Sequence, residues 1–190
     1  NFMKSALERA MERADRIEVP EAKVKQMKYR SEGERIAADF LKNPAYDLTS
    51  QLSRFDAESG KYVCQAVETV LLQNLILPKK ENQLTRNDDV FRGLAMIKKN
   101  KDGLRQAQDQ MANLSNYYAQ AIKQSYERLK AELERAMQQT MNKSGMARGA
   151  KMNLEGMPEF QENWRQVSGK LEAEYGRALS QLKQHIVSLS

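Results

Sequence analysis

The sequence is poor in residues that break helices or carry covalent chemistry. Its 190 residues include nine glycines, four prolines, one cysteine (Cys64) and one histidine (His185). A single cysteine excludes an intramolecular disulfide and a zinc site built from several thiolates. The longest apolar run, Val70 to Leu77, is interrupted by Gln73 and Asn74, and no early stretch resembles a signal peptide. We therefore expect a soluble, cytoplasmic protein without a membrane segment.

The residues that are abundant favour helix. Ala, Leu, Met, Gln, Glu, Lys and Arg are frequent, and β-branched residues rarely cluster. Intrinsic preferences therefore sum toward helix in most windows of the chain. The sequence predicts an all-α protein, in which Cys64 is a small buried apolar residue.

The first hundred residues predict a base of short helices. Ser31 with Glu34 three residues later matches a capping box and predicts the start of a helix. Thr85 or Asn87 is the expected N-cap of a later helix, whose last turn contains Lys98 and Lys99. Apolar spacing and prolines give the expected helical segments 7–17, 21–29, 31–43, 48–55, 61–77 and 85–99.

The last ninety residues predict a long antiparallel hairpin with a coiled-coil-like seam. Apolar residues recur at steps of three and four from residue 102 to about 141, and again from 158 to 190. The first of these helices would be roughly 60 Å long. If the chain folds back near residue 149, Trp164 lies beside Arg135, Ala136 or Met137.

The connector at the expected tip, residues 142–157, has an unusual composition. Four of the ten methionines lie between residues 141 and 157, together with three glycines that allow the backbone to turn. Alternation around Met152 and Leu154 predicts an extended strap on the helices, with both side chains turned inward. Met146, between two glycines, is the expected exposed partner contact.

The formal net charge of +6 is concentrated in the middle of the chain. Residues 1–60 and 158–190 each carry equal numbers of basic and acidic side chains, so the excess lies between them. Basic residues without specific nucleic-acid motifs favour non-specific phosphate contacts or solvated surfaces. The candidate phosphate or partner contacts are Lys98, Lys99, Lys101, Arg105, Lys143, Arg148 and Lys151.

No catalytic, cofactor or metal signature is present in the sequence. On a helix, His185 has Gln181 and Ser188 as neighbours on its own face, so no second ligand stands beside it. Carboxylates such as Glu132 and Glu134 lie two positions apart and point to different faces. We therefore expect no catalytic residue, no cofactor and no metal site.

Several stretches resemble a known family. The segments "ERAMERADRIEV", "SEGERIAADFL", "KYVCQAVETVLLQNLILPK" and "PEFQENWRQVSGKLEAEYGRAL" are similar to an uncharacterised family of bacterial helical proteins, a domain of unknown function. The resemblance covers most of the chain. It implies a bacterial intracellular helical protein and brings no activity or site residue.

These observations predict an N-terminal helical base over residues 1–100 and a hairpin over residues 101–190, forming one continuous unit. The favoured hypothesis is a non-enzymatic interaction or scaffold protein that self-associates, as a dimer, through its hairpin and binds an unidentified protein partner. The alternative is a basic nucleic-acid-associated protein that uses the hairpin tip and the 98–105 cluster. A second alternative is a small-ligand binding protein or an enzyme.

Overall fold

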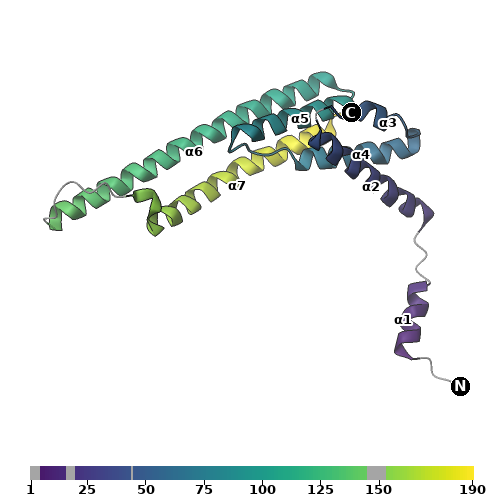
Figure 1. The fold of residues 1–190 in the computed structure, drawn as a ribbon, viewed down its shortest axis with the longest axis horizontal. Coiled ribbons are helices and arrows are strands. Elements are labelled where there is room, and N and C mark those ends of the chain that lie inside the picture. Colours follow the sequence, from purple (N-terminus) through teal and green to yellow (C-terminus); the bar gives the residue numbers. More distant parts are fainter. Residues whose placement is uncertain (1–4, 16–19, 44, 145–152) are drawn as a thin grey trace. The chain divides into compact units, whose positions relative to one another are not determined.

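The computed structural model describes residues 5–15, 20–43, 45–144 and 153–190. Every regular element in these ranges is a helix, so the all-α prediction is confirmed (Figure 1). The elements are α1 (Ala6–Asp15), α2 (Glu21–Lys42), α3 (Leu48–Leu52), α4 (Ala57–Gln73), α5 (Glu81–Ile97), α6 (Lys101–Ser144), the 3-10 helix η1 (Leu154–Gly156) and α7 (Pro158–Ser188). None of the helices in these ranges combines the length and apolarity needed to cross a bilayer.

The chain forms two compact units, residues 1–71 and 72–190, and the boundary falls inside α4. The expected division at residue 100, into a base and a hairpin, concerns the domain organisation and stays a prediction.

In the first unit, α2 corrects the predicted break at Ser31. The segment forms one continuous helix rather than two, and Ser31 lies inside it, exposed. No helix-breaking residue separates Tyr29 from Ser31, and Arg30 Nε donates to Glu34 Oε1 at 2.9 Å along the exposed face. The Ser-x-x-Glu pattern therefore does not mark a helix start here. The buried face of this helix contains Ile36, Ala37 and Phe40.

The close approach of α2 to α4 depends on Gly33. A Cβ atom built at this position would lie 2.5 Å from the carbonyl oxygen of Val63 and 2.7 Å from the Cβ of Ala66. Only a residue without a side chain fits between the two backbones. Cys64, on the same turn of α4, is half-buried rather than fully buried.

In the second unit, α5 begins at Glu81, four residues or more before the predicted caps Thr85 and Asn87. Gln83 sets this start, because its Oε1 accepts from the backbone N–H groups of Lys79 and Lys80 at 2.6 and 3.2 Å. Asn87 is instead buried inside the helix. Its amide donates to the carbonyl of Ile76 and accepts from the N–H of Ile76, which fixes the connector that follows α4.

The hairpin of α6 and α7 is confirmed, but its predicted register is wrong. Trp164 lies against Tyr126, with ring centroids 5.1 Å apart, rather than beside residues 135–137. Glu155, just before α7, accepts from Lys130 Nζ at 2.9 Å. From Lys130, α6 continues to Ser144, roughly 21 Å farther. It therefore runs past η1 and the start of α7, as Figure 1 shows.

Half of the expected connector, residues 145–152, lies outside the described residues, and this half includes Met146, Gly149 and Met152. Leu154 is turned inward as predicted and is 8% exposed. It belongs to the 3-10 turn η1, however, so the extended conformation predicted for it is wrong. The side chain of Asn153 accepts from the N–H of Gly156 and closes this turn.

Candidate functional site

The second unit contains a cleft of about 310 Å³ at the point where the connector before α5 meets the hairpin. The connector contributes one wall and the two long helices contribute the others. Its lining residues are Pro78, Lys79, Tyr118, Ala119, Ile122, Trp164, Ser168 and Glu172. We refer to it as the Tyr118 cleft.

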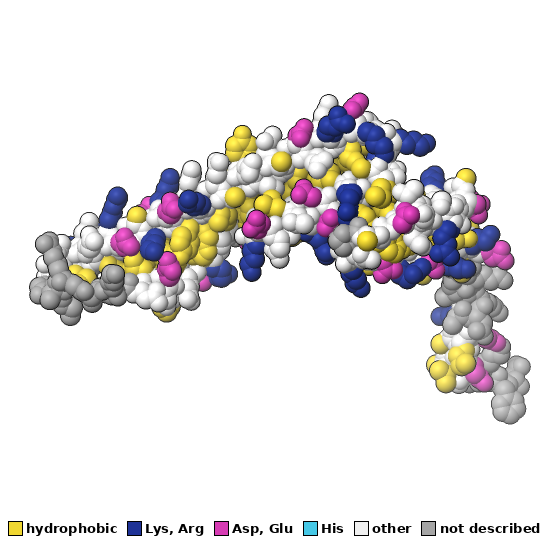
Figure 2. Space-filling view, turned by 45° about the horizontal axis from the view of Figure 1, so that its top comes forward, with side chains coloured by type: hydrophobic (Ala, Val, Ile, Leu, Met, Phe, Trp, Pro, Cys, Tyr) yellow, Lys and Arg dark blue, Asp and Glu magenta, His cyan; other side chains and the backbone are white. Residues whose placement is uncertain are grey.

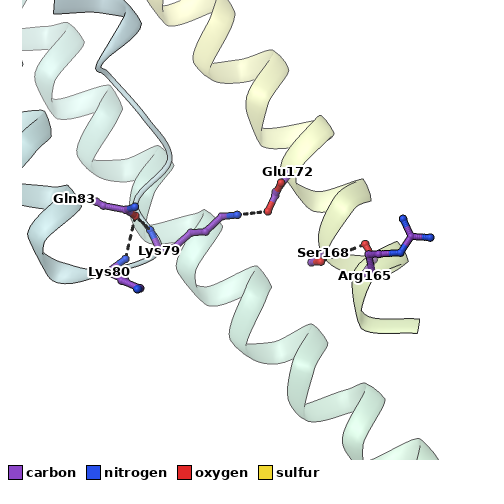
Figure 3. Close-up of polar contacts among 6 residues, drawn as sticks. All are labelled: Lys79, Lys80, Gln83, Arg165, Ser168 and Glu172. Carbon is purple, nitrogen blue, oxygen red and sulfur yellow. Dashed lines mark hydrogen bonds and ion pairs between the residues drawn. The ribbon is translucent and has the colours of Figure 1, made fainter. Parts of the chain in front are cut away.

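Helical spacing explains why these side chains converge. Tyr118 and Ile122 are four residues apart on α6, and Trp164, Ser168 and Glu172 follow one another at the same interval on α7, so each set shares a helix face. The Gln83 side chain holds the connector backbone on the opposite wall. From there Lys79 extends across to Glu172, as Figure 3 shows.

Tyr118 is the most buried polar residue of the cleft. Its side chain is 1% exposed, and its ring packs against that of Tyr175 with centroids 5.5 Å apart. The hydroxyl oxygen is closed to solvent, and no hydrogen-bond partner for it exists in the described part of the chain. Burial raises the pKa of Tyr118; the charge of Lys79 opposes this effect and that of Glu172 adds to it. The group is therefore a neutral hydroxyl that can both donate and accept.

Lys79 and Glu172 form an ion pair at the mouth of the cleft. The hydrogen bond to Glu172 is the main reason that the pKa of Lys79 is raised, ahead of the opposing effect of burial. The two side chains remain 57% and 46% exposed. An ion pair with this much contact with water has a small net stability and opens easily.

The basic residues predicted as contacts are not brought together. Lys98, Lys99, Lys101 and Arg105 surround the start of α6, whereas Lys143 is at its far end, roughly 63 Å away along the helix. Arg148 and Lys151, like Met146, lie outside the described residues. The two basic clusters of the nucleic-acid alternative therefore do not form one continuous patch.

Two of these lysines have structural contacts. Lys98 is 7% exposed, and its Nζ donates to the carbonyl oxygens of Val187 and Leu189 at 3.2 and 2.7 Å. Lys101 Nζ donates to the carbonyl oxygens of Ala95 and Lys98. Both ammonium groups therefore satisfy carbonyls at helix ends, where a cation is favoured.

The other predicted contacts lie on the surface. Lys99, Arg105 and Lys143 are exposed, and Arg105 has Asp102 as a neighbour at 4.0 Å. Phosphate binding through these residues stays a prediction.

Sequence reasoning missed the Tyr118 cleft. Periodicity places the aromatic residues of the hairpin among its repeating apolar residues, and nothing in the sequence relates Lys79 to Glu172, which are 93 positions apart. The pattern that could have revealed the cleft is the series Trp164, Ser168 and Glu172. These residues share one face of a helix, and two of them are polar where an apolar seam would continue. Among the described residues, no cluster of three His, Cys, Asp or Glu side chains could hold a metal ion.

Comparison with protein families gives one match, to a family of unknown function, DUF6657, over residues 49–188. The chain belongs to this family. The match includes every residue of the Tyr118 cleft and leaves α1 and α2 outside it. Comparison with curated proteins and with solved structures gives no match. Membership of DUF6657 therefore agrees with the resemblance seen in the sequence and adds no activity.

Proposed function

We propose that the protein is a non-enzymatic interaction protein that self-associates through the distal hairpin, defined as residues 122–144 of α6 and 158–171 of α7. The observation that carries this proposal is a change in the burial of the apolar seam along the hairpin. Near the start of α6, the seam residues Leu104, Ala107, Met111 and Tyr118 are no more than 4% exposed. In the distal hairpin none of the α6 seam residues is fully buried.

The partly exposed seam continues over five turns of α6 and is matched on α7. On α6 its half-buried residues are Ile122, Leu129, Leu133, Met137 and Met141, and on α7 they are Trp164, Val167 and Leu171. Figure 2 shows apolar side chains along the hairpin between flanking charged ones. α5 packs on α6 as a third helix, and Figure 1 shows it beside the part of α6 that is near the start of the hairpin.

A second copy of the same hairpin suits this surface. Two helices alone leave part of each apolar stripe open to water, and two such hairpins can close the stripes in a four-helix arrangement. A twofold dimer would use the same seam on both protomers. We favour a second copy of this chain over a different protein because the seam can pair with itself in this way.

Light scattering after size exclusion tests the proposal. We expect the wild-type chain to have the mass of a dimer at micromolar concentration. The double variant Leu133→Glu, Met137→Glu should have the mass of a monomer, because it places two charges in the seam. Both positions are half-buried, so the helix itself should survive, which circular dichroism checks.

The matched control introduces the same side chain outside the seam. Gln138 is exposed on α6, next to Met137, and Gln138→Glu should keep the mass of the dimer. A wild-type chain that remains monomeric throughout the micromolar range would contradict the proposal. So would a double variant that dimerises as strongly as the control.

A further inference from the structure

The buried hydroxyl of Tyr118 is the feature of the second unit that its fold explains least. Buried polar groups are normally paired, because an unpaired one loses its bonds to water without replacement. A phenylalanine at position 118 would keep the ring contact with Tyr175, and the Tyr118 hydroxyl adds no hydrogen bond within the described residues. An unpaired buried hydroxyl in the wall of a cleft is a candidate group for recognising a bound molecule.

The wall of the cleft that α7 contributes contains an aromatic side chain that is held in place. Trp164 lies edge to face with Tyr126, at an interplanar angle of 87° and a centroid distance of 5.1 Å. Tyr126 also contacts Phe160 at 5.3 Å. The indole is therefore held between α6 and α7 before any ligand arrives, and Pro78 and Ile122 add apolar surface to the cleft.

The charges at the mouth indicate which ligands the cleft accepts. Lys79 and Glu172 neutralise one another, so the cleft offers no unpaired charge to hold an ion. Both side chains are long and partly solvated, and when the pair opens they can move aside without unpacking a helix. Both side chains line the cleft together with Tyr118, and both charges act on its hydroxyl, so a ligand that reaches this hydroxyl meets the ion pair first.

We propose that the Tyr118 cleft binds a small neutral aromatic molecule with one hydrogen-bonding group, which pairs with the Tyr118 hydroxyl while its ring lies against Trp164. A volume of about 310 Å³ is at the lower end for small-molecule sites and suits a compound of one or two rings. This binding goes beyond self-association. Ile122 and Trp164 belong both to the cleft and to the proposed dimer seam, whereas Leu133 and Met137 lie outside the cleft.

The test uses two probes that differ only in the hydroxyl, p-cresol and toluene. Trp164 is the only tryptophan, so its indole N–H gives a single side-chain NMR signal that reports on the cleft. Titration with p-cresol should shift this signal in a saturable way. Tyr118→Phe should weaken p-cresol binding by about 2- to 12-fold, the range for a neutral hydrogen bond, and leave toluene binding unchanged.

Tyr117→Phe is the matched control, because the neighbouring tyrosine is 63% exposed and lies outside the cleft. It should not alter binding of either probe. Repeating the titration on the double variant Leu133→Glu, Met137→Glu separates ligand binding from dimerisation. An absence of saturable shifts with p-cresol, or equal weakening of both probes by Tyr118→Phe, overturns the proposal.

Thermal unfolding without a probe gives a second, independent readout. If the hydroxyl is kept for a ligand, its removal relieves an unpaired group, and Tyr118→Phe should raise the melting temperature. Excess p-cresol should narrow or reverse this difference, since it stabilises the wild type more than the variant. A melting temperature lowered by Tyr118→Phe would show that the hydroxyl has an internal structural role and would also overturn the proposal.

Discussion

Lys130 donates a hydrogen bond to Glu155 at 2.9 Å, and this contact marks where the returning chain meets α6 again. The hydrogen bond to Lys130 is the largest of the effects that lower the pKa of Glu155. The two residues are exposed, so the pair contributes little to stability by itself. The contact matters because α7 begins three residues after Glu155. It therefore sets which turns of α7 lie beside which turns of α6.

The register of the hairpin is tested by Tyr126→Ala. Tyr126 contacts both Phe160 and Trp164. Each aromatic pair contributes about 0.5–1.5 kcal/mol beyond its buried area, so the free energy of unfolding should fall by roughly 2 kcal/mol. Urea denaturation measures the loss, and near-ultraviolet circular dichroism of Trp164 should change as well. Arg135→Ala, at the position that the sequence had paired with Trp164, should change stability by less than about 0.5 kcal/mol.

The structural role of Lys98 is tested by comparing it with the neighbouring residue Lys99. Lys98→Met removes the donor to the carbonyls of Val187 and Leu189, and it should lower the free energy of unfolding by about 2 kcal/mol, as expected for charged hydrogen bonds. Lys99→Met, on the exposed neighbour, should have almost no effect. Chemical denaturation compares the two variants. Equal stability would mean that Lys98 is a surface residue, available for the phosphate contacts that the sequence suggested.

The helix contact in the first unit is tested by Gly33→Ala. The added methyl would meet the backbone of Val63, which cannot swing aside, and overpacking of this kind costs about 1–3 kcal/mol. Gly60→Ala in α4 is the control, because its Cβ would lie 3.7 Å from the Cβ of Phe55, an ordinary contact. It should stabilise the helix by up to about 1 kcal/mol. Thermal unfolding that ranks the variants the other way would contradict this packing.

The carboxylate of Glu162, on α7, should make the stability of the protein depend on pH. Hydrogen bonds from Arg165 and then Gln166 lower the pKa of Glu162 from its ordinary 4.5 to about 2. Between these pH values the unfolded chain binds more protons than the folded one. The contribution of Glu162 to stability is therefore complete above pH 4.5 and is lost as the pH falls toward 2.

Carbon-13 NMR titration of the Glu162 carboxyl measures this pKa directly. Arg165→Ala should raise it toward the ordinary value, whereas Arg177→Ala, farther along α7, should leave it unchanged. A wild-type midpoint near 4.5 would show that the Arg165 contact is not maintained in solution.

Periodicity in the sequence was sufficient to predict the helices and the hairpin, because a buried stripe repeats at every turn. It was insufficient for features set by single contacts. Ser31 and Glu34 match a capping box, but the same spacing occurs inside a continuous helix when nothing breaks the chain before it. Gln83, rather than Thr85, sets the start of α5 through backbone groups that periodicity does not reveal.

The register and the cleft depend on distant pairs. The prediction for Trp164 assumed that both helices end at the same level, whereas α6 extends past the contact between Lys130 and Glu155. The cleft requires Lys79 to face Glu172 and the Tyr118 hydroxyl to be buried without a partner. Both are consequences of tertiary packing, and a single sequence carries no direct signal of either.

The seam residues of α6 are buried near the start of the helix and half-buried farther along. The rate of amide hydrogen exchange should therefore change along this single helix. Amide protons near Leu104 and Met111 should be protected longest, since these residues are buried and the Asn100 N–H bonds to the Ser190 carbonyl at 2.8 Å, which ties residue 190 to the start of α6. Those beyond Leu133 should exchange soonest. Opening would then begin at the far end of α6 and travel toward the Tyr118 cleft, and a dimer that covers the seam would slow its first step.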